Sequence, residues 1–321
     1  MRSIVSMDTV QIETTNHCIH SCSNCTRFCG HHYEPYHMDF EFFKKAVDSM
    51  VGYPKMVGMM GGEPLLHPEF ERLCEYALSK IPRAQLGLWS CFPSGKEHLR
   101  EVIVETFGNV FLNDHTRDDI YHCPILVAAQ EVIANRDEMF SAINECWLQH
   151  AWSAAINPRG AFFCEIAASM SLLFDPDETM PGWPVRPGWW WKTPKDFTDQ
   201  IEEYCPLCGV AIQLPLRAST DGRDDVSQGI LDRLMGRSRK IDKGKYVLSD
   251  LACTDCNPPM AAYKDQDYRD RIADRYGIFL TINEKMFLQP HLKKAANCLE
   301  PRKPLWQVYR ETYGGTTICR Y

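Results

Sequence analysis

The sequence predicts an α/β fold in which parallel β-strands alternate with α-helices. In the first third of the chain, short apolar runs typical of strands recur, and segments with apolar residues at helical spacing separate them. Strands separated by helices of about 10–15 residues form βαβ units and therefore a parallel sheet. Turns rich in cysteine or glycine directly follow two of these runs. The carboxyl ends of parallel strands are where α/β proteins place their ligand-binding loops.

Each expected element has its own signal in the sequence. Asp39 is a favourable N-cap, and the apolar residues after it are spaced to bury one face of a helix. These apolar residues are Phe42, Phe43, Ala46, Val47 and Met50. The expected strands span 10–14, 56–60, 85–90 and 109–113, and further helices are expected over 68–79 and 96–107.

The pattern changes near residue 140, which predicts a second structural unit. A hairpin rich in tryptophan is expected from Cys146 to Cys164, with its turn at 157–160. A stretch rich in Pro, Trp and Gly follows at 175–194 and is interpreted as a loop. The predicted domains are a core over 1–140, a second domain over 141–215 and a C-terminal extension of unknown role over 216–321.

The composition excludes several classes of protein. The 321 residues are 45% hydrophobic and 24% charged, as in ordinary globular proteins. No apolar run reaches about 18 residues and no secretory leader is visible, so a cytoplasmic protein without a membrane span is expected. The net charge of −7 argues against binding to nucleic acid, and the basic stretch at 237–245 is interpreted as a solvated loop. Fifteen cysteines indicate metal or redox chemistry in a reducing compartment.

Three closely spaced cysteines are the strongest signal of function. Cys18, Cys22 and Cys25 form a CX3CX2C loop directly after the first expected strand. Thiolates are soft ligands that favour iron-sulfur clusters or zinc. Three thiolates can hold three irons of a [4Fe-4S] cluster and leave the fourth iron free to bind a substrate or cosubstrate.

Other interpretations of this loop stay open. A structural zinc site needs a fourth ligand, which His17, His20 or Cys29 could supply. An electron carrier of the ferredoxin type would use four cysteines for each cluster. A disulfide framework fits poorly with a long chain that shows no secretory leader.

A glycine-rich motif follows the second expected strand. Gly61 and Gly62 would let a ligand approach the backbone closely, and Glu63 is a natural partner for an ammonium group. The alternative is an ordinary strand-to-helix turn in which Glu63 is a solvated residue at the start of a helix.

The CX3CX2C loop followed by Gly-Gly-Glu-Pro resembles the radical S-adenosylmethionine (SAM) family. The resemblance implies a partial (β/α)6 barrel, a SAM-binding [4Fe-4S] cluster on the three cysteines, and contacts from Gly61, Gly62 and Glu63 to the SAM amino group. It also implies reductive cleavage of SAM to a 5′-deoxyadenosyl radical that abstracts a hydrogen atom from the substrate. Strand-end residues are candidates for contacts with the SAM ribose or carboxylate. They are Ser90, Asn113 and His115.

Asn24 departs from the family pattern. The residue before the third cluster cysteine is often aromatic or apolar in radical SAM enzymes, where it lies beside the adenine. The asparagine at this position in the present chain implies different packing there.

A second set of cysteines resembles the twitch domain, a shortened relative of the SPASM extension in radical SAM enzymes. The set is Cys146, Cys164, Cys205 and Cys208, with Gly160 in the expected hairpin. The resemblance implies that these four thiolates hold an auxiliary [4Fe-4S] cluster. Three residues separate Gly160 from the next cysteine where the family usually has four. A four-thiolate zinc site is the alternative.

The catalytic residues are not assigned by the sequence, although three candidates can be named. Cys253 and Cys256 could give a hydrogen atom to a substrate radical, or could join Cys298 and Cys319 in a third metal site. Glu165, next to Cys164, could be a base or a hydroxyl anchor, but a surface carboxylate is the more ordinary interpretation.

The resemblance favours a small, polar, carbohydrate-like substrate that is oxidised, dehydrated or epimerised. A group of tryptophans could form a stacking wall for such a substrate, or could pack the loop against the barrel. They are Trp183, Trp189, Trp190 and Trp191. The expected partners are this substrate and a one-electron donor such as flavodoxin or ferredoxin. The alternatives are a ribosomally made peptide as substrate, or a non-catalytic metal-binding or electron-transfer protein.

Overall fold

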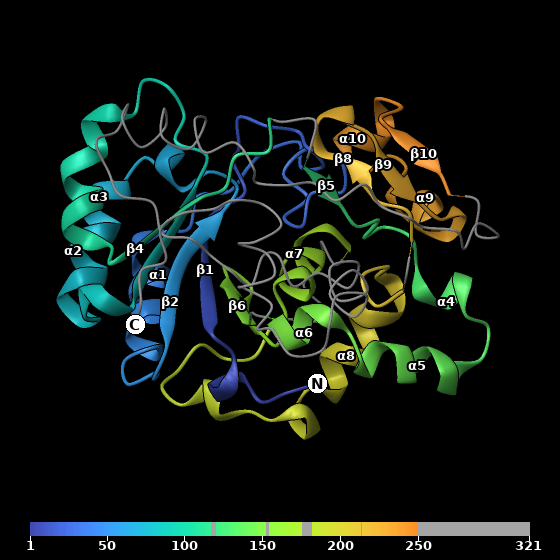
Figure 1. Cartoon of the computed structure of the whole chain (residues 1–321), viewed down its shortest axis with the longest axis horizontal. Helices are drawn as coiled ribbons and strands as arrows, with labels where there is room; N and C mark the ends of the chain where they lie inside the picture. Colours follow the sequence, from blue (N-terminus) through green and yellow to red (C-terminus); the bar gives the residue numbers. More distant parts are fainter. Residues whose placement is uncertain (117–119, 152–153, 175–181, 213, 250–321) are drawn as a thin grey trace, which may run out of the picture.

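A six-stranded sheet forms the centre of the computed structural model (Figure 1), which describes residues 1–116, 120–151, 154–174, 182–212 and 214–249. The strand order is β4-β3-β2-β1-β6-β7. All neighbouring pairs are parallel except β6 and β7, which are antiparallel. The strands are β1 (Thr9–Thr15), β2 (Met56–Gly61), β3 (Leu86–Ser90), β4 (Asn109–Leu112), β6 (Ala154–Asn157) and β7 (Gly160–Phe162).

The helices between the first four strands lie together along one side of the sheet (Figure 1). They are α1 (Phe40–Ser49), α2 (Phe70–Lys80) and α3 (Arg100–Thr106). Asp39 caps α1 as expected, because its side chain accepts a hydrogen bond from the Phe42 amide at 2.9 Å. The prediction of a mixed α/β fold with a parallel sheet is therefore confirmed.

The hairpin predicted for the second domain extends the sheet of the first. Its turn at 157–160 is confirmed, and Val10 of β1 lies opposite Ala154 of β6. The predicted start of the hairpin is wrong, because Trp147 begins the helix α6 (Trp147–Ala151). Leu, Gln and Ala in this pentapeptide are good helix formers, and Trp147 is its one residue of a type enriched in strands. The helix α7 (Glu165–Phe174) follows β7 and contacts both strands of the hairpin.

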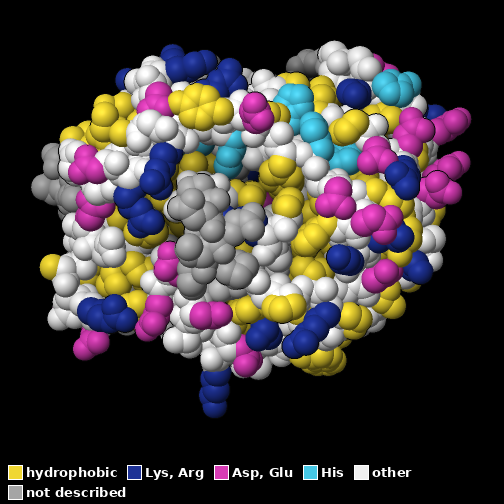
Figure 2. All heavy atoms as spheres, turned by 180° about the vertical axis from the view of Figure 1, so that it is seen from behind, with side chains coloured by type: hydrophobic (Ala, Val, Ile, Leu, Met, Phe, Trp, Pro, Cys, Tyr) yellow, Lys and Arg dark blue, Asp and Glu magenta, His cyan; other side chains and the backbone are white. Residues whose placement is uncertain are grey.

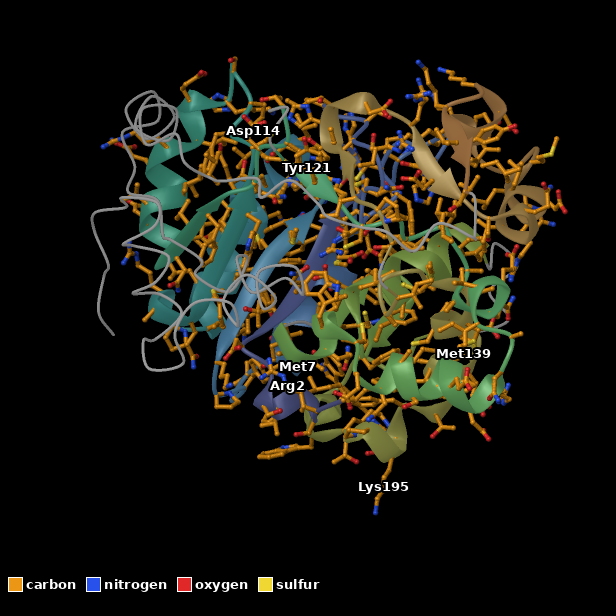
Figure 3. All side chains as sticks on the ribbon, turned by 45° about the vertical axis from the view of Figure 1, so that its right-hand side comes forward. Arg2, Met7, Asp114, Tyr121, Met139 and Lys195 are labelled. Carbon is orange, nitrogen blue, oxygen red and sulfur yellow. The ribbon has the colours of Figure 1, made fainter. Side chains whose placement is uncertain are left out.

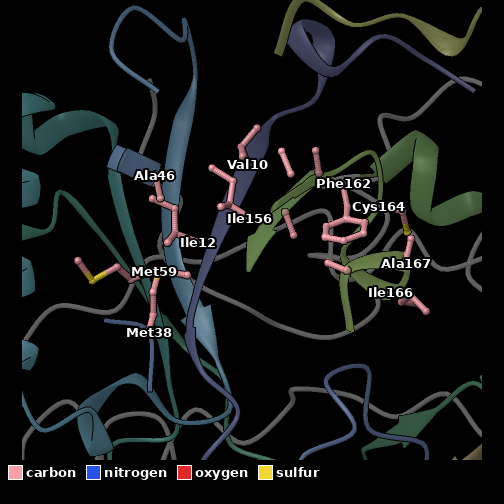
Figure 4. Close-up of a cluster of buried hydrophobic side chains, with 14 of the residues drawn as sticks. Val10, Ile12, Met38, Ala46, Met59, Ile156, Phe162, Cys164, Ile166 and Ala167 are labelled. Atoms are coloured by element: carbon pink, nitrogen blue, oxygen red, sulfur yellow. The ribbon is translucent and has the colours of Figure 1, made fainter. Parts of the chain in front are cut away.

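The two ends of the sheet differ in chemistry. In Figure 3, Asp114 and Tyr121 lie near the carboxyl ends of the parallel strands, and Met7 lies at the opposite end. Between these ends, apolar side chains from neighbouring strands and from the hairpin fill the core, where Val10, Ile12 and Ile156 meet (Figure 4). The loops that carry polar and sulfur-containing side chains therefore follow strands whose side chains pack in an apolar core.

Residues 217–248 lie beside the carboxyl end of the sheet (Figure 1). The short strand β5 (Tyr121–His122) pairs with β8 (Arg217–Ala218), and β9 (Asp224–Val226) pairs with β10 (Tyr246–Leu248). The remaining α-helices of the described residues are α4 (Ala129–Val132), α5 (Arg136–Asn144), α8 (Thr198–Tyr204), α9 (Gln228–Leu234) and α10 (Arg239–Asp242). None of the helices in the described part of the chain is long and apolar enough to cross a membrane.

Candidate functional site

The cysteine loop and the glycine-rich motif line one cavity of about 160 Å³ at the carboxyl ends of the strands. Histidine side chains gather in the upper part of the face that Figure 2 shows. Among the residues that line the cavity are Cys18, Cys22, Cys25, Gly61, Gly62 and Glu63. The structure thus brings together two motifs that lie more than thirty residues apart in the sequence.

The two glycines are required by the close approach of two loops. The Gly62 amide donates to the Thr15 carbonyl at 2.6 Å, and the Glu63 amide donates to the His17 carbonyl at 2.7 Å. A Cβ at Gly61 would collide with the Thr15 carbonyl oxygen, and one at Gly62 would collide with that of His17. The glycines therefore hold the motif against the start of the cysteine loop.

Glu63 is buried and is already satisfied by the protein. Its carboxylate accepts hydrogen bonds from the Ser90 hydroxyl at 2.7 Å, the Cys91 amide at 2.7 Å and the Leu65 amide at 3.0 Å. Burial raises the pKa of this carboxyl. Ser90, which the sequence suggested as a SAM contact, is buried and does not line the cavity. The hydrogen bond between Ser90 and Glu63 joins the end of β3 to the turn after β2. Glu63 itself lines the cavity.

A fourth thiol stands beside the three of the CX3CX2C loop. Cys29 lines the same cavity and is hydrogen-bonded to the Cys18 and Cys25 side chains. These bonds raise the pKa of Cys29, and its bond to Cys25 lowers the pKa of that thiol well below its usual range. Cys29 is therefore a fourth sulfur donor in this cavity.

The neighbouring wall of the cavity carries a chain of hydrogen bonds that the sequence suggested only in part. His122 bonds to the Ser23 carbonyl at 2.6 Å and to His115 at 2.7 Å, and His115 bonds to Asn113 at 2.9 Å. Burial lowers the pKa of both imidazoles. Asn113 and His115, the two other strand-end candidates, line the cavity, and so does His122, which is held to the cysteine loop by its bond to the Ser23 carbonyl.

A buried charged group forms another part of the site. The Arg27 guanidinium lies 3.1 Å from a carboxylate oxygen of Glu13 and 3.1 Å from one of Glu165, and it also donates to the Gln11 side chain. Glu165 is only 4% exposed, so its interpretation as a surface carboxylate is wrong. The positive charge of Arg27 offsets the negative charge of the Glu165 carboxylate, which allows Glu165 to remain in the interior.

Sequence reasoning missed Arg27, Gln11 and Glu13. The signal that could have found them is two polar residues at alternate positions in an otherwise strand-like run, since alternate residues face the same side. All seven residues of β1 are buried, so Gln11 and Glu13 must find partners in the interior of the fold.

Glu13→Gln is expected to weaken the dependence of stability on pH. Burial raises the pKa of Glu13 from 4.5 to about 7. The stabilisation from the protonated form is complete below pH 4.5 and is lost as the pH rises through 7. At about 1.4 kcal/mol for each pKa unit, the effect is on the order of 3 kcal/mol. Urea unfolding of the variant between these pH values should give a flatter profile than wild type.

The exposed Glu71 on α2 provides the control for this measurement. Glu71→Gln should keep the wild-type slope of unfolding free energy against pH. Equal slopes for Glu13→Gln and wild type would contradict the assignment of a raised pKa to Glu13.

The second set of cysteines also shares one cavity, of about 30 Å³. Cys146 precedes α6, and Cys164 lies between β7 and α7. Cys205 begins the 3₁₀ turn that follows α8, and Cys208 comes directly after that turn. Burial raises the pKa of all four thiols, that of Cys164 to about 12. The four candidate ligands, spread over more than sixty residues, are thus brought together.

Neither set of cysteines converges on a single point. Within the described ranges, no three or more His, Cys, Asp or Glu side chains are arranged to hold one metal ion. Each set instead lines a cavity with sulfur donors, the donor type that iron-sulfur clusters use. A cluster binds each thiolate through a different iron and so requires wider spacing than one ion does. The donor chemistry of both cavities fits such clusters.

Of the two interpretations of the tryptophans, the structure favours packing of the loop for three of them, whereas Trp191 is exposed. Trp183, Trp189 and Trp190 are buried and do not line the cavity. The Trp189 and Trp190 indoles donate to the Ser49 hydroxyl and carbonyl at the end of α1. Tryptophan N–H groups need partners when buried, and here packing of the loop supplies them. Cys253, Cys256, Cys298 and Cys319 lie outside the described residues.

No protein-family model matches the chain, and no curated protein matches it. Among solved structures, it is similar to BtrN in complex with AdoMet and 2-DOIA, with a TM-score of 0.41 and 13% identity over 63% of this chain and 92% of that chain. It is also similar to SeMet BtrN in an open conformation, with a TM-score of 0.38 and 12% identity over 63% and 88% of the two chains. These scores are too low for the likeness to carry an argument about this chain.

Proposed function

We propose that this protein is a radical SAM enzyme whose Cys18, Cys22 and Cys25 hold a [4Fe-4S] cluster. One observation carries the proposal: a single cavity is lined by the three thiols of the CX3CX2C loop and by the Gly-Gly-Glu motif. The loop supplies soft ligands, and the motif supplies close-packed backbone at the adjacent strand end. When bound, the cluster supplies the electron that splits SAM into methionine and a 5′-deoxyadenosyl radical, which abstracts hydrogen from the substrate.

The protein's own residues bind and orient the reactants in this proposal. The backbone at Gly61 and Gly62 receives the SAM amino group, and Asn113 and His115 face its ribose or carboxylate. Glu165 lines the same cavity and anchors a substrate hydroxyl, with Arg27 holding the carboxylate in place. Polar side chains at the cavity, among them Thr26, Asn113 and Glu165, would hold the hydroxyls of a small carbohydrate-like substrate. A flavodoxin- or ferredoxin-type donor supplies the electron.

The second cavity holds the auxiliary [4Fe-4S] cluster in this proposal. Cys146, Cys164, Cys205 and Cys208 supply four thiolates, which would leave no iron of that cluster open. Glu165 follows Cys164 directly in the sequence and is ion-paired to Arg27 of the cysteine loop. The proposal therefore puts the substrate hydroxyl in the first cavity at Glu165, next in the sequence to the auxiliary ligand Cys164.

Iron and sulfide analysis of anaerobically prepared protein tests the proposal, together with detection of 5′-deoxyadenosine after reduction in the presence of SAM. About eight irons with matching sulfide are expected from two cubane clusters, and about twelve would add a third. Zinc without sulfide, or clusters without SAM cleavage, would overturn the assignment.

Cys29→Ala should retain SAM cleavage, because the proposal leaves the fourth iron to SAM. The closeness of Cys29 to Cys18 and Cys25 favours a second candidate, a four-thiolate metal or electron-transfer site without SAM chemistry. The measurement is the change that SAM induces in the electron paramagnetic resonance (EPR) spectrum of the reduced cluster. It should be present in both wild type and variant. A SAM response that appears only after Cys29 is removed would identify Cys29 as the fourth ligand.

A further inference from the structure

A buried ion pair from the C-terminal part of the described chain contacts the cysteine loop. The Lys240 ammonium donates to the Cys22 carbonyl oxygen at 2.7 Å and to the Asp224 carboxylate at 2.7 Å. Lys240 is 2% exposed and Asp224 is fully buried. The sequence interpretation of 237–245 as a solvated loop is therefore wrong for Lys240. A buried lysine costs several kcal/mol of desolvation unless it is paired, so this contact is specific rather than incidental.

Asp224 also holds the turn of the loop between Cys22 and Cys25. Its carboxylate accepts a hydrogen bond from the backbone amide of Asn24. The other carboxylate oxygen lies 2.6 Å from Nε2 of His31. Asn24 has a positive φ of 48°, and its side chain exchanges two further hydrogen bonds with Asp225, at 2.8 and 2.9 Å. Asparagine tolerates this left-handed conformation better than a bulky residue does. This explains the departure from the apolar residue that the family usually carries here.

The electrostatic consequence follows from burial. Lys240 and Asp224 are fixed charges of opposite sign, and both contact the backbone of the segment that carries Cys22 and Cys25. Charges in a low-dielectric interior act more strongly than charges in water. Adding an electron to an iron-sulfur cluster adds negative charge, so a nearby cation favours the reduced form and a nearby anion favours the oxidised form.

We propose that Lys240 and Asp224 are positioning residues that hold the cysteine loop and set the reduction potential of the cluster bound there. This inference rests on the proposed function, since it presumes a cluster at Cys18, Cys22 and Cys25. It assigns a role to residues 224–240, which the sequence left as part of an extension without one. These residues complete the cluster site from outside its sulfur ligands.

The test compares the midpoint potential of the cluster in two variants that remove opposite charges. Lys240→Gln should make the potential more negative, and Asp224→Asn should make it more positive. We expect each variant to change the ratio of reduced to oxidised cluster at a fixed applied potential by about tenfold, or about 59 mV for a one-electron couple. In the double variant Lys240→Gln/Asp224→Asn, the midpoint potential of the cluster should return towards the wild-type value. A merely structural role would move both single variants in the same direction.

The exposed neighbour Arg239 gives a matched control, because Arg239→Gln removes one positive charge from the same helix. Its cluster potential should stay near that of wild type. In the metal-free protein, Asp224→Asn should also accelerate hydrogen exchange at the Asn24 amide. If Lys240→Gln does not fold, Lys240→Met tests the same charge.

The failures of the two proposals are distinguishable. Wild-type protein that assembles no cluster at the CX3CX2C loop would refute the proposed function. A wild-type cluster that cleaves SAM, combined with Lys240 and Asp224 variants that match the Arg239 control or shift in one common direction, would refute this inference alone.

Discussion

Cys22→Ala is expected to abolish the formation of 5′-deoxyadenosine from SAM. The variant removes one of the three thiolates that the cavity offers to the SAM-binding cluster. The auxiliary cysteines line a separate cavity, so their cluster should remain. The expected iron content is therefore about four for each chain instead of about eight. Product detection by mass spectrometry and iron analysis of the same sample measure both effects.

Cys74→Ala is the matched control, because Cys74 is fully buried on α2 and lines neither of the two cavities. It should keep both the iron content and the cleavage of SAM. Undiminished 5′-deoxyadenosine production by Cys22→Ala would refute the assignment of the loop.

Arg27→Met is expected to lower the free energy of unfolding by about 3–5 kcal/mol, the range for breaking a buried ion pair. Methionine keeps a long, unbranched side chain like the apolar stem of arginine but removes the charge. The buried carboxylates of Glu13 and Glu165 then lose the cation that they share. The loss should fall near the lower limit when Glu13 is protonated, since its pKa is raised to about 7. Urea unfolding of the metal-free protein at pH 6 and pH 8 measures both statements.

Arg72→Met provides the comparison on the surface. Arg72 on α2 pairs with Glu69, and both side chains are at least 40% exposed. Its loss should cost only about 1 kcal/mol, from the exposed ion pair and from the contact of its guanidinium with the Phe40 ring. Adding Glu165→Gln to Arg27→Met should recover part of the lost stability, because it removes one of the two buried carboxylate charges that lost the Arg27 guanidinium. Equal stabilities for Arg27→Met and Arg72→Met would contradict the buried network.

Local sequence signals predicted the elements of the fold well. Asp39, the apolar spacing after it, and the strand runs at 56–60 and 109–113 act over neighbouring residues, so no tertiary information was needed to place them. The interpretation failed where burial decides the role of a polar side chain. Glu165 and Lys240 are charged residue types that usually lie at the surface, and their distant partners Arg27 and Asp224 pair with them in the interior.

The sequence by itself determined which residues carry sulfur and in what spacing, and hence the two candidate sets of ligands. Spacing is a property of the chain, and the short CX3CX2C segment keeps its thiols together in almost any compact fold. Only the tertiary structure decided that Cys29 lies beside them and that the Ser90 hydroxyl donates to Glu63. It also decided that Asp224 of β9 binds the backbone of the loop at Asn24. Those contacts join residues as far as two hundred positions apart, and the packing of the whole core fixes them.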